Sequence, residues 1–211
     1  MKLYISSFGL GNRTDVLKNW INENDNKIAL IPNSRDILDD ERRQAGIDRD
    51  TKALEELGFE VTVISLRDYF GMPDKLREDL NKFRAFFAIG GNVFTLRQAM
   101  KLSGFDEYLK EMINQDILYS GYSAGICLLA PNMQGLELVD DPNVDVYGCD
   151  PIFEGLGIID FVPIPHFDSD HPESEIINDV IEYMQINGIN HKPMRDGDVI
   201  IEEAVNHKLN K

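Results

Sequence analysis

The sequence has few cysteines and lacks long apolar runs. Its 211 residues include two cysteines, Cys127 and Cys149, whose spacing indicates neither a disulfide framework nor a metal site. No run of about 18 apolar residues occurs, so we expect no transmembrane helix. The apolar stretch after Lys2 reaches Asn12 and Arg13 too early for a signal peptide. These absences predict a cytoplasmic protein with reduced thiols.

Basic residues are scarce relative to acidic ones. There are 21 Lys and Arg against 37 Asp and Glu, which gives a formal net charge of −16. A surface this acidic repels phosphate backbones and anionic lipids, so we expect neither nucleic acid nor a membrane as a partner. The length and the 43 % of hydrophobic residues predict a single packed domain over residues 1–211. Whether this domain forms a homodimer is left open by the sequence.

Short apolar runs alternate with segments of helical periodicity. Strands are expected at 2–7, 27–32, 59–66, 85–89, 117–122, 158–165 and 199–203, and helices at 14–23, within 37–57, and at 73–82, 93–102, 105–114, 123–129 and 174–186. Residues 131–157 are rich in Gly, Pro and Asp and predict a loop excursion. The pattern predicts an α/β fold of three layers, with a mostly parallel sheet between helices and a ligand site at the carboxyl ends of the strands.

The strongest motif is the pentapeptide Gly-Tyr-Ser-Ala-Gly at residues 121–125. It lies between an apolar strand and an apolar helix, which is the context of a nucleophile elbow. The glycines allow a strained turn, and the following helix begins with free amides. We therefore interpret Ser123 as a candidate nucleophile and the Ala124 amide as a candidate oxyanion donor.

A nucleophilic serine needs a base and a residue that orients the base. His166 directly follows the predicted strand at 158–165, which favours it over the loop residues His171 and His191 and over His207 in the charged tail. The orienting acid stays open at this point. The candidates are Asp196, Asp168, Glu137, Asp140 and Asp141.

A second glycine turn follows the predicted strand at 85–89. Gly90 and Gly91 precede Asn92 and a predicted helix, so backbone amides here are candidates for a second oxyanion donor.

Three segments together resemble one known family. The Gly90–Phe94 turn, the Ser123 motif and the Pro165–Phe167 segment are similar to those of the peptidase E group, the S51 serine peptidases, which include aspartyl dipeptidase and the cyanophycinases. The resemblance implies a flavodoxin-like fold related to class I glutamine amidotransferase domains. It also implies a peptidase that acts on small peptides such as dipeptides and that needs no cofactor or metal.

The resemblance also implies roles for individual residues. Ser123 matches the family nucleophile and His166 the family histidine, and Gly91 and Ala124 match the oxyanion donors. Asp196 aligns with a late turn in which the family carries a glutamate, so its side chain is shorter by one methylene group.

Substrate recognition departs from the family. Aspartyl dipeptidase recognises its acidic substrate with an arginine after the histidine, but residues 167–183 contain no Arg or Lys here. Carboxylates in this segment would repel an acidic side chain, so we do not expect aspartyl specificity. Candidate substrate-binding residues are Asn92, Asp168 and Asp170, with the two acids suited to an α-ammonium or a basic side chain.

Four alternatives remain beside the peptidase. The cluster of His166, Asp168, Asp170 and His171 has ligand types that suit zinc or manganese. An α/β-hydrolase would need Asp198 and His207 as partners of the serine. The glycines after the first strand form a broken nucleotide-binding fingerprint. A catalytically silent, amidotransferase-like protein would bind a small molecule or peptide without turnover.

Overall fold

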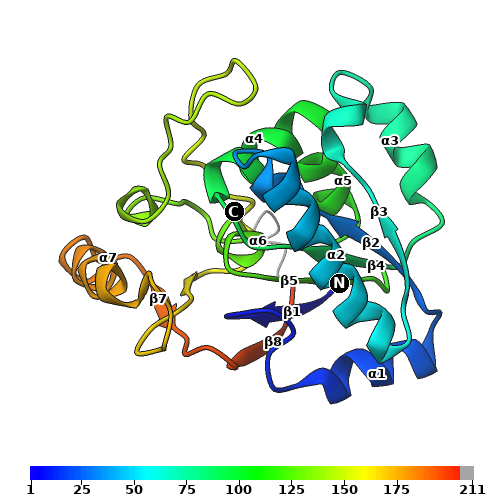
Figure 1. Cartoon of the computed structure of the whole chain (residues 1–211), viewed down its shortest axis with the longest axis horizontal. Helices are drawn as coiled ribbons and strands as arrows, with labels where there is room; N and C mark the ends of the chain where they lie inside the picture. Colours follow the sequence, from blue (N-terminus) through cyan, green and yellow to red (C-terminus); the bar gives the residue numbers. More distant parts are fainter. Residues whose placement is uncertain (205–211) are drawn as a thin grey trace.

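A computed structural model describes residues 1–204. Its central sheet has six strands in the order β3-β2-β4-β5-β1-β8 (Figure 1). The strands are β1 (Lys2–Ser6), β2 (Lys27–Ile31), β3 (Glu60–Val63), β4 (Ala85–Ala88), β5 (Leu118–Tyr122) and β8 (Val199–Glu203). All neighbouring pairs are parallel except β1 and β8, which are antiparallel. The chain runs from β2 to β3 in one direction along the sheet and from β4 to β5 in the other, so the strand order reverses between β2 and β4. Sheets of this kind bind ligands at such a point.

Helices cover both faces of this sheet, as the three-layer prediction requires. Residues of α1 (Thr14–Glu23) and α2 (Asp40–Leu57) belong to one apolar cluster. The other cluster contains residues of α3 (Pro73–Leu80), α4 (Val93–Ser103), α5 (Phe105–Glu111) and α6 (Ala124–Cys127). The predicted α/β architecture is thus confirmed.

The strands divide their side chains between these two clusters. In β4, Phe87 packs in the α1 and α2 cluster, whereas Phe86 packs in the other. Tyr4 and Leu3 of β1 are divided in the same way. Because both faces are buried, apolar residues occupy consecutive positions, and the strands read as continuous apolar runs.

A second, two-stranded sheet lies to one side of the central sheet. It pairs β6 (Val162–Ile164) in parallel with β7 (His191–Pro193), and α7 (Ser174–Ile186) connects them (Figure 1). The predicted strand at 158–165 is therefore only three residues long and pairs outside the central sheet. Strand β7 was not predicted, because its residues His-Lys-Pro lack an apolar pattern.

The excursion at 131–157 is irregular but anchored. It contains the short 3-10 turn η3 (Leu136–Leu138) and one isolated bridge between Asn132 and Glu154. Met133 and Leu136 are buried in the core.

Two further 3-10 turns, η1 (Asn33–Arg35) and η2 (Leu66–Tyr69), follow β2 and β3. Within residues 1–204, no helix is long and apolar enough to cross a membrane.

Candidate active site

The predicted site residues meet where several strands end. Ser123 follows β5, Gly91 and Asn92 follow β4, and His166 follows β6. All four line one cavity of about 310 Å³. The carboxyl ends of β4 and β5 lie at one edge of the central sheet, and β6 of the separate sheet brings His166 to the same cavity.

Ser123 lies on a strained turn between β5 and α6. Its φ of 49° and ψ of −120° lie outside the regions that side-chain-bearing residues favour. Close approach of the Ala88 carbonyl fixes the turn. A Cβ at Gly121 would lie 2.5 Å from that oxygen, and a Cβ at Gly125 would lie 2.1 Å from it. The glycines of the motif are therefore required by packing, and the turn leaves Ser123 half-buried at the cavity.

The turn after β4 also excludes side chains. Gly91 has φ 154°, and a Cβ there would lie 2.5 Å from the carbonyl oxygen of Ser34. Within residues 1–204, the amides of Gly91 and Ala124 donate to no protein acceptor, which leaves both free for a ligand. Asn92 caps α4, since its Oδ1 accepts from the Thr95 amide at 2.9 Å. Its Nδ2 donates to the Asp141 carbonyl at 2.9 Å, so both ends of this side chain already have partners.

His166 is held by Asp196 and Ser7. Its Nδ1 lies 2.8 Å from Oδ1 of Asp196, a distance at which the ring N–H donates to the carboxylate. The Ser7 hydroxyl donates to the same oxygen at 3.0 Å and accepts from the His166 amide at 3.0 Å. The Asp196 amide donates to Ser169 Oγ at 2.7 Å. This network fixes the ring and leaves its Nε2 available as a proton acceptor.

The imidazole of His166 is buried, with a relative exposure of 2 %. Burial lowers its pKa below the usual 6.5, and the nearby charge of His171 lowers it further, while Asp196 opposes both effects. His171 stacks on His166, and Phe8 contacts both rings edge to face. A histidine with a lowered pKa is in the basic form at neutral pH.

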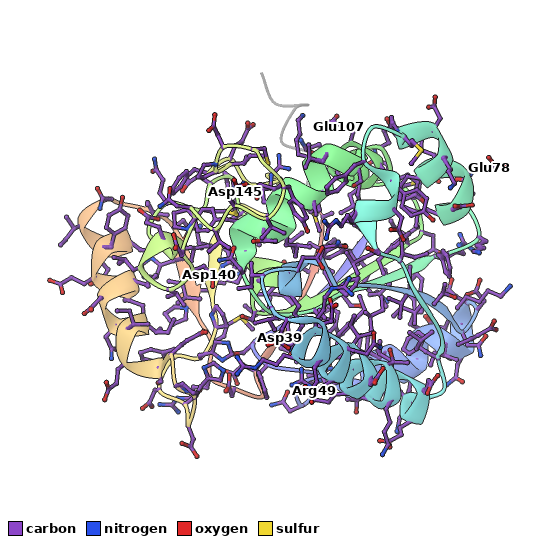
Figure 2. The ribbon with its side chains drawn as sticks, turned by 45° about the horizontal axis from the view of Figure 1, so that its top comes forward. Asp39, Arg49, Glu78, Glu107, Asp140 and Asp145 are labelled. Carbon is purple, nitrogen blue, oxygen red and sulfur yellow. The ribbon has the colours of Figure 1, made fainter. Side chains whose placement is uncertain are left out.

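Two further acids line the cavity. Asp140 of the excursion is half-buried, and its Oδ2 accepts from the Val93 amide at 2.7 Å. Burial, together with the charge of Glu173, raises the pKa of Asp140 to about 7. Glu173, just before α7, places Oε2 3.9 Å from Nε2 of His166. Figure 2 shows Asp140 between α7 and the body of the sheet.

Sequence reasoning missed Arg35, which also lines the cavity. Its guanidinium donates to the Gly90 carbonyl at 3.0 Å and to the Tyr122 hydroxyl at 3.1 Å. Tyr122 in turn donates to Asp50 at 2.7 Å, and Arg49 donates to Tyr122 at 2.6 Å. Figure 2 shows Arg49 on α2. Arg35 lies in a 3-10 turn whose place beside β4 follows only from the tertiary fold.

The remaining candidates lie elsewhere. Asp168 forms an ion pair with Arg195, and both side chains are exposed. Asp170 lines a separate surface hollow. Glu137 and Asp141 accept from the nearby amides of Gly135 and Asn143, and Asp198 accepts from the amide of Arg195. His207 lies outside the described residues. Of the five candidate acids, Asp196 is the one hydrogen-bonded to His166 among the described residues.

The candidate metal cluster is rearranged in the structure. His166 and His171 lie close together, and their third neighbour is Glu173 rather than Asp168 or Asp170. The potential ligand atoms of these three residues lie within 4.8 Å of one another. However, the two imidazole planes are only 9° apart and face each other. Parallel stacked rings direct their lone pairs side by side, so His171 would have to turn before both could bind one ion.

A strained serine beside a His–Asp pair on an α/β sheet is typical of serine hydrolases. The model of peptidase family S51 matches residues 7–205. An uncharacterized peptidase, Lin0382 of Listeria innocua, is 30 % identical over 159 residues, which are 72 % of this chain and 74 % of that protein. Peptidase E of Streptomyces coelicolor is 34 % identical over 95 residues, which are 45 % of this chain and 37 % of the relative.

A crystal structure of a Listeria monocytogenes EGD-e protein assigned to peptidase E has the same fold. Its TM-score is 0.75 at 22 % identity, with 97 % of this chain and 98 % of that chain covered. The chain therefore belongs to peptidase family S51, as the sequence resemblance predicted. It is a serine-type peptidase, a hydrolase.

Proposed function

We propose that this peptidase hydrolyses small peptides, of about two residues, with Ser123 as nucleophile, His166 as base and Asp196 as orienting acid. The observation that carries this proposal is the 2.8 Å contact between Asp196 and Nδ1 of His166, in a ring that shares its cavity with Ser123. A base with its Nδ1 hydrogen-bonded to a carboxylate can accept a proton at Nε2.

The reaction then has two stages, acylation of Ser123 and hydrolysis of the acyl-enzyme. Ser123 Oγ attacks the peptide carbonyl carbon, and its proton moves to Nε2 of His166. The amides of Gly91 and Ala124 bind the oxyanion, a contribution of about 3–4 kcal/mol for each donor. His166 then returns the proton to the leaving amine as the C–N bond breaks. A water molecule, deprotonated by His166, releases the acyl group from Ser123 by the reverse sequence.

The size of the cavity supports a small substrate. Its volume of about 310 Å³ lies at the lower end of the range for small-molecule sites, which is roughly 300–1,000 Å³. Asp140 of the excursion forms part of the wall, and Phe8, Ile37 and Leu38 supply apolar surface. A dipeptide of extended length about 7 Å matches such a site better than a long chain does.

A dipeptide library tests the proposal, with wild type beside Ser123→Ala. We expect hydrolysis and fluorophosphonate labelling by wild type and neither by the variant. Labelling without hydrolysis of any peptide would contradict the substrate class. Absence of both would favour the alternative of a catalytically silent binding protein.

A further inference from the structure

Asp140 and Glu173 adjoin the candidate nucleophile but have no part in the chemistry described so far. Both line the 310 Å³ cavity, and both also line a smaller cavity of about 30 Å³ that Ser123 and Ala124 share. We propose that Asp140 and Glu173 together bind the α-ammonium group of the substrate, so that the enzyme requires a free N-terminus. This inference rests on the proposed function and assigns a recognition site to it.

Neither carboxylate has the arginine partner that two buried acids elsewhere in the fold have, although Asp140 is half-buried and Glu173 lies at the mouth of the cavity. Asp50 pairs with Arg49, and Asp36 pairs with Arg43. Within residues 1–204, no lysine or arginine forms an ion pair with Asp140 or Glu173. The bases nearest to Glu173 are the imidazoles of His166 and His171, each at 3.9 Å. Two carboxylates in a partly buried cavity repel each other, and a cation between them removes this cost.

Their position matches the place where an α-ammonium must lie. Asp140 is hydrogen-bonded to the amide of Val93, two residues beyond the candidate oxyanion donor Gly91. Glu173 lies beside Nε2 of His166, the atom that exchanges protons with Ser123 and the leaving amine. The α-nitrogen of the first residue is only two bonds from the carbonyl carbon that Ser123 attacks. In the proposed complex the oxyanion lies at Gly91 and that nitrogen lies between Asp140 and Glu173, which line the same cavity as Ser123.

The smaller cavity that both acids line limits the size of the group that can lie between them. Beyond Ser123 the smaller cavity is lined by the side chains of Val93, Cys127, Leu136, Ile164 and Ile177. Its volume of about 30 Å³ is far smaller than the 310 Å³ of the main cavity. An ammonium group fits such a space, whereas an acylated N-terminus would meet apolar walls and two carboxylates.

The test compares three substrates that differ only at the N-terminus. They are the best dipeptide of the library, its N-acetyl derivative, and its analogue with a hydroxyl in place of the ammonium. A charge-assisted hydrogen bond corresponds to roughly a 10–100-fold effect on affinity. We expect wild type to prefer the dipeptide over the hydroxyl analogue by about that factor in kcat/KM, mainly through KM.

Asp140→Asn and Glu173→Gln should each reduce this preference about tenfold, because each removes one charge from the site. Matched controls are Asp145→Asn on the same excursion and Glu175→Gln in the first turn of α7, which should retain the preference. Fluorophosphonate labelling of Ser123 needs no ammonium, so it should stay within about threefold of wild type in the two control variants. In Asp140→Asn and Glu173→Gln the labelling rate is measured as well, and each hydrolysis rate is divided by it. That readout separates recognition from folding and from the chemical step.

Two results would overturn the inference while the proposed function stands. One is equal hydrolysis of the dipeptide and its N-acetyl derivative by wild type. The other is a loss in Asp140→Asn or Glu173→Gln that, after division by the labelling rate of the same variant, is the same for all three substrates. If labelled wild type hydrolyses no dipeptide at all, the proposed function fails, and the recognition site fails with it.

Discussion

The imidazole of His171 lies flat against that of His166, with ring centroids 3.7 Å apart and planes 9° apart. Burial and the nearby charge of His171 both lower the pKa of His166. A base with a lowered pKa stays deprotonated in mildly acidic solution, so in the proposed mechanism His171 extends the pH range over which His166 can activate Ser123.

His171→Ala should therefore raise the pKa of His166, because the variant uncovers the ring and removes the neighbouring charge. The acidic limb of the pH profile of fluorophosphonate labelling should move to higher pH. His171→Phe keeps the cover without the charge, and its limb should lie between those of wild type and His171→Ala. Identical limbs in all three proteins would show that the stack does not tune His166.

Asp196→Asn should reduce labelling and hydrolysis by about 10³–10⁴-fold, as expected when the orienting carboxylate of a triad is lost. The amide can offer N–H to Nδ1 and so favour the wrong tautomer. Asp168→Asn is the matched control, because Asp168 is exposed and pairs with Arg195. The measurement is the single-turnover rate of fluorophosphonate labelling of each variant. A similar rate for the two would remove Asp196 from the triad.

The sequence could predict the fold and the candidate nucleophile, because both depend on local patterns. Buried strands read as apolar runs, and Ser123 directly follows one of them. Ser7, Arg35 and Glu173 had no such signal. They come from the end of β1, from η1 and from the residue before α7, and only the tertiary fold brings them to one cavity. The separate β6–β7 sheet was missed because its two strands have three residues each.

Gly125→Ala should destabilise the protein through packing alone. The added Cβ would lie 2.1 Å from the Ala88 carbonyl oxygen, so β4 or α6 has to shift. Overpacking of this kind costs about 1–3 kcal/mol, or a decrease in Tm of several degrees in a protein of this size. Gly148→Ala is the control: its Cβ meets no atom within 4 Å, and only its φ of 68° is unfavourable. The Tm of each variant is measured by thermal unfolding. A smaller decrease in Tm for Gly125→Ala than for Gly148→Ala would contradict the packing argument.

The tip of the excursion, residues 142–150, should limit substrate length. Tyr147 donates to Asp36 at 2.5 Å, which ties the tip to the residue next to Arg35 in the cavity wall. Met133, Leu136 and Leu156 are buried, so removal of all of 131–157 would open the core. Replacement of only the tip by two glycines should increase kcat/KM for tetrapeptides relative to dipeptides. Unchanged selectivity for length would rule out a role of the tip as a cover.

The pH dependence of kcat/KM should identify Asp140 as a ligand of the α-ammonium. Asp140 has a pKa of about 7, raised by burial and by Glu173, so it loses its charge as the pH falls below that value. The α-amino group of a peptide loses its own charge above about pH 8. Attraction between the two is therefore greatest from about pH 7 to 8, and KM should rise on either side.

Asp140→Asn removes the acidic group, so the acidic limb of kcat/KM should move down to the pH at which His166 is protonated. Glu173 and His171, which also line the cavity, are unchanged in this variant. A fluorophosphonate carries no ammonium group. The acidic limb of its labelling rate should therefore report the protonation of His166 in both proteins. An acidic limb near pH 7 that persists for the dipeptide in Asp140→Asn would assign that titration to another group. A limb that moves for the dipeptide but not for labelling would place the effect on substrate binding rather than on the base.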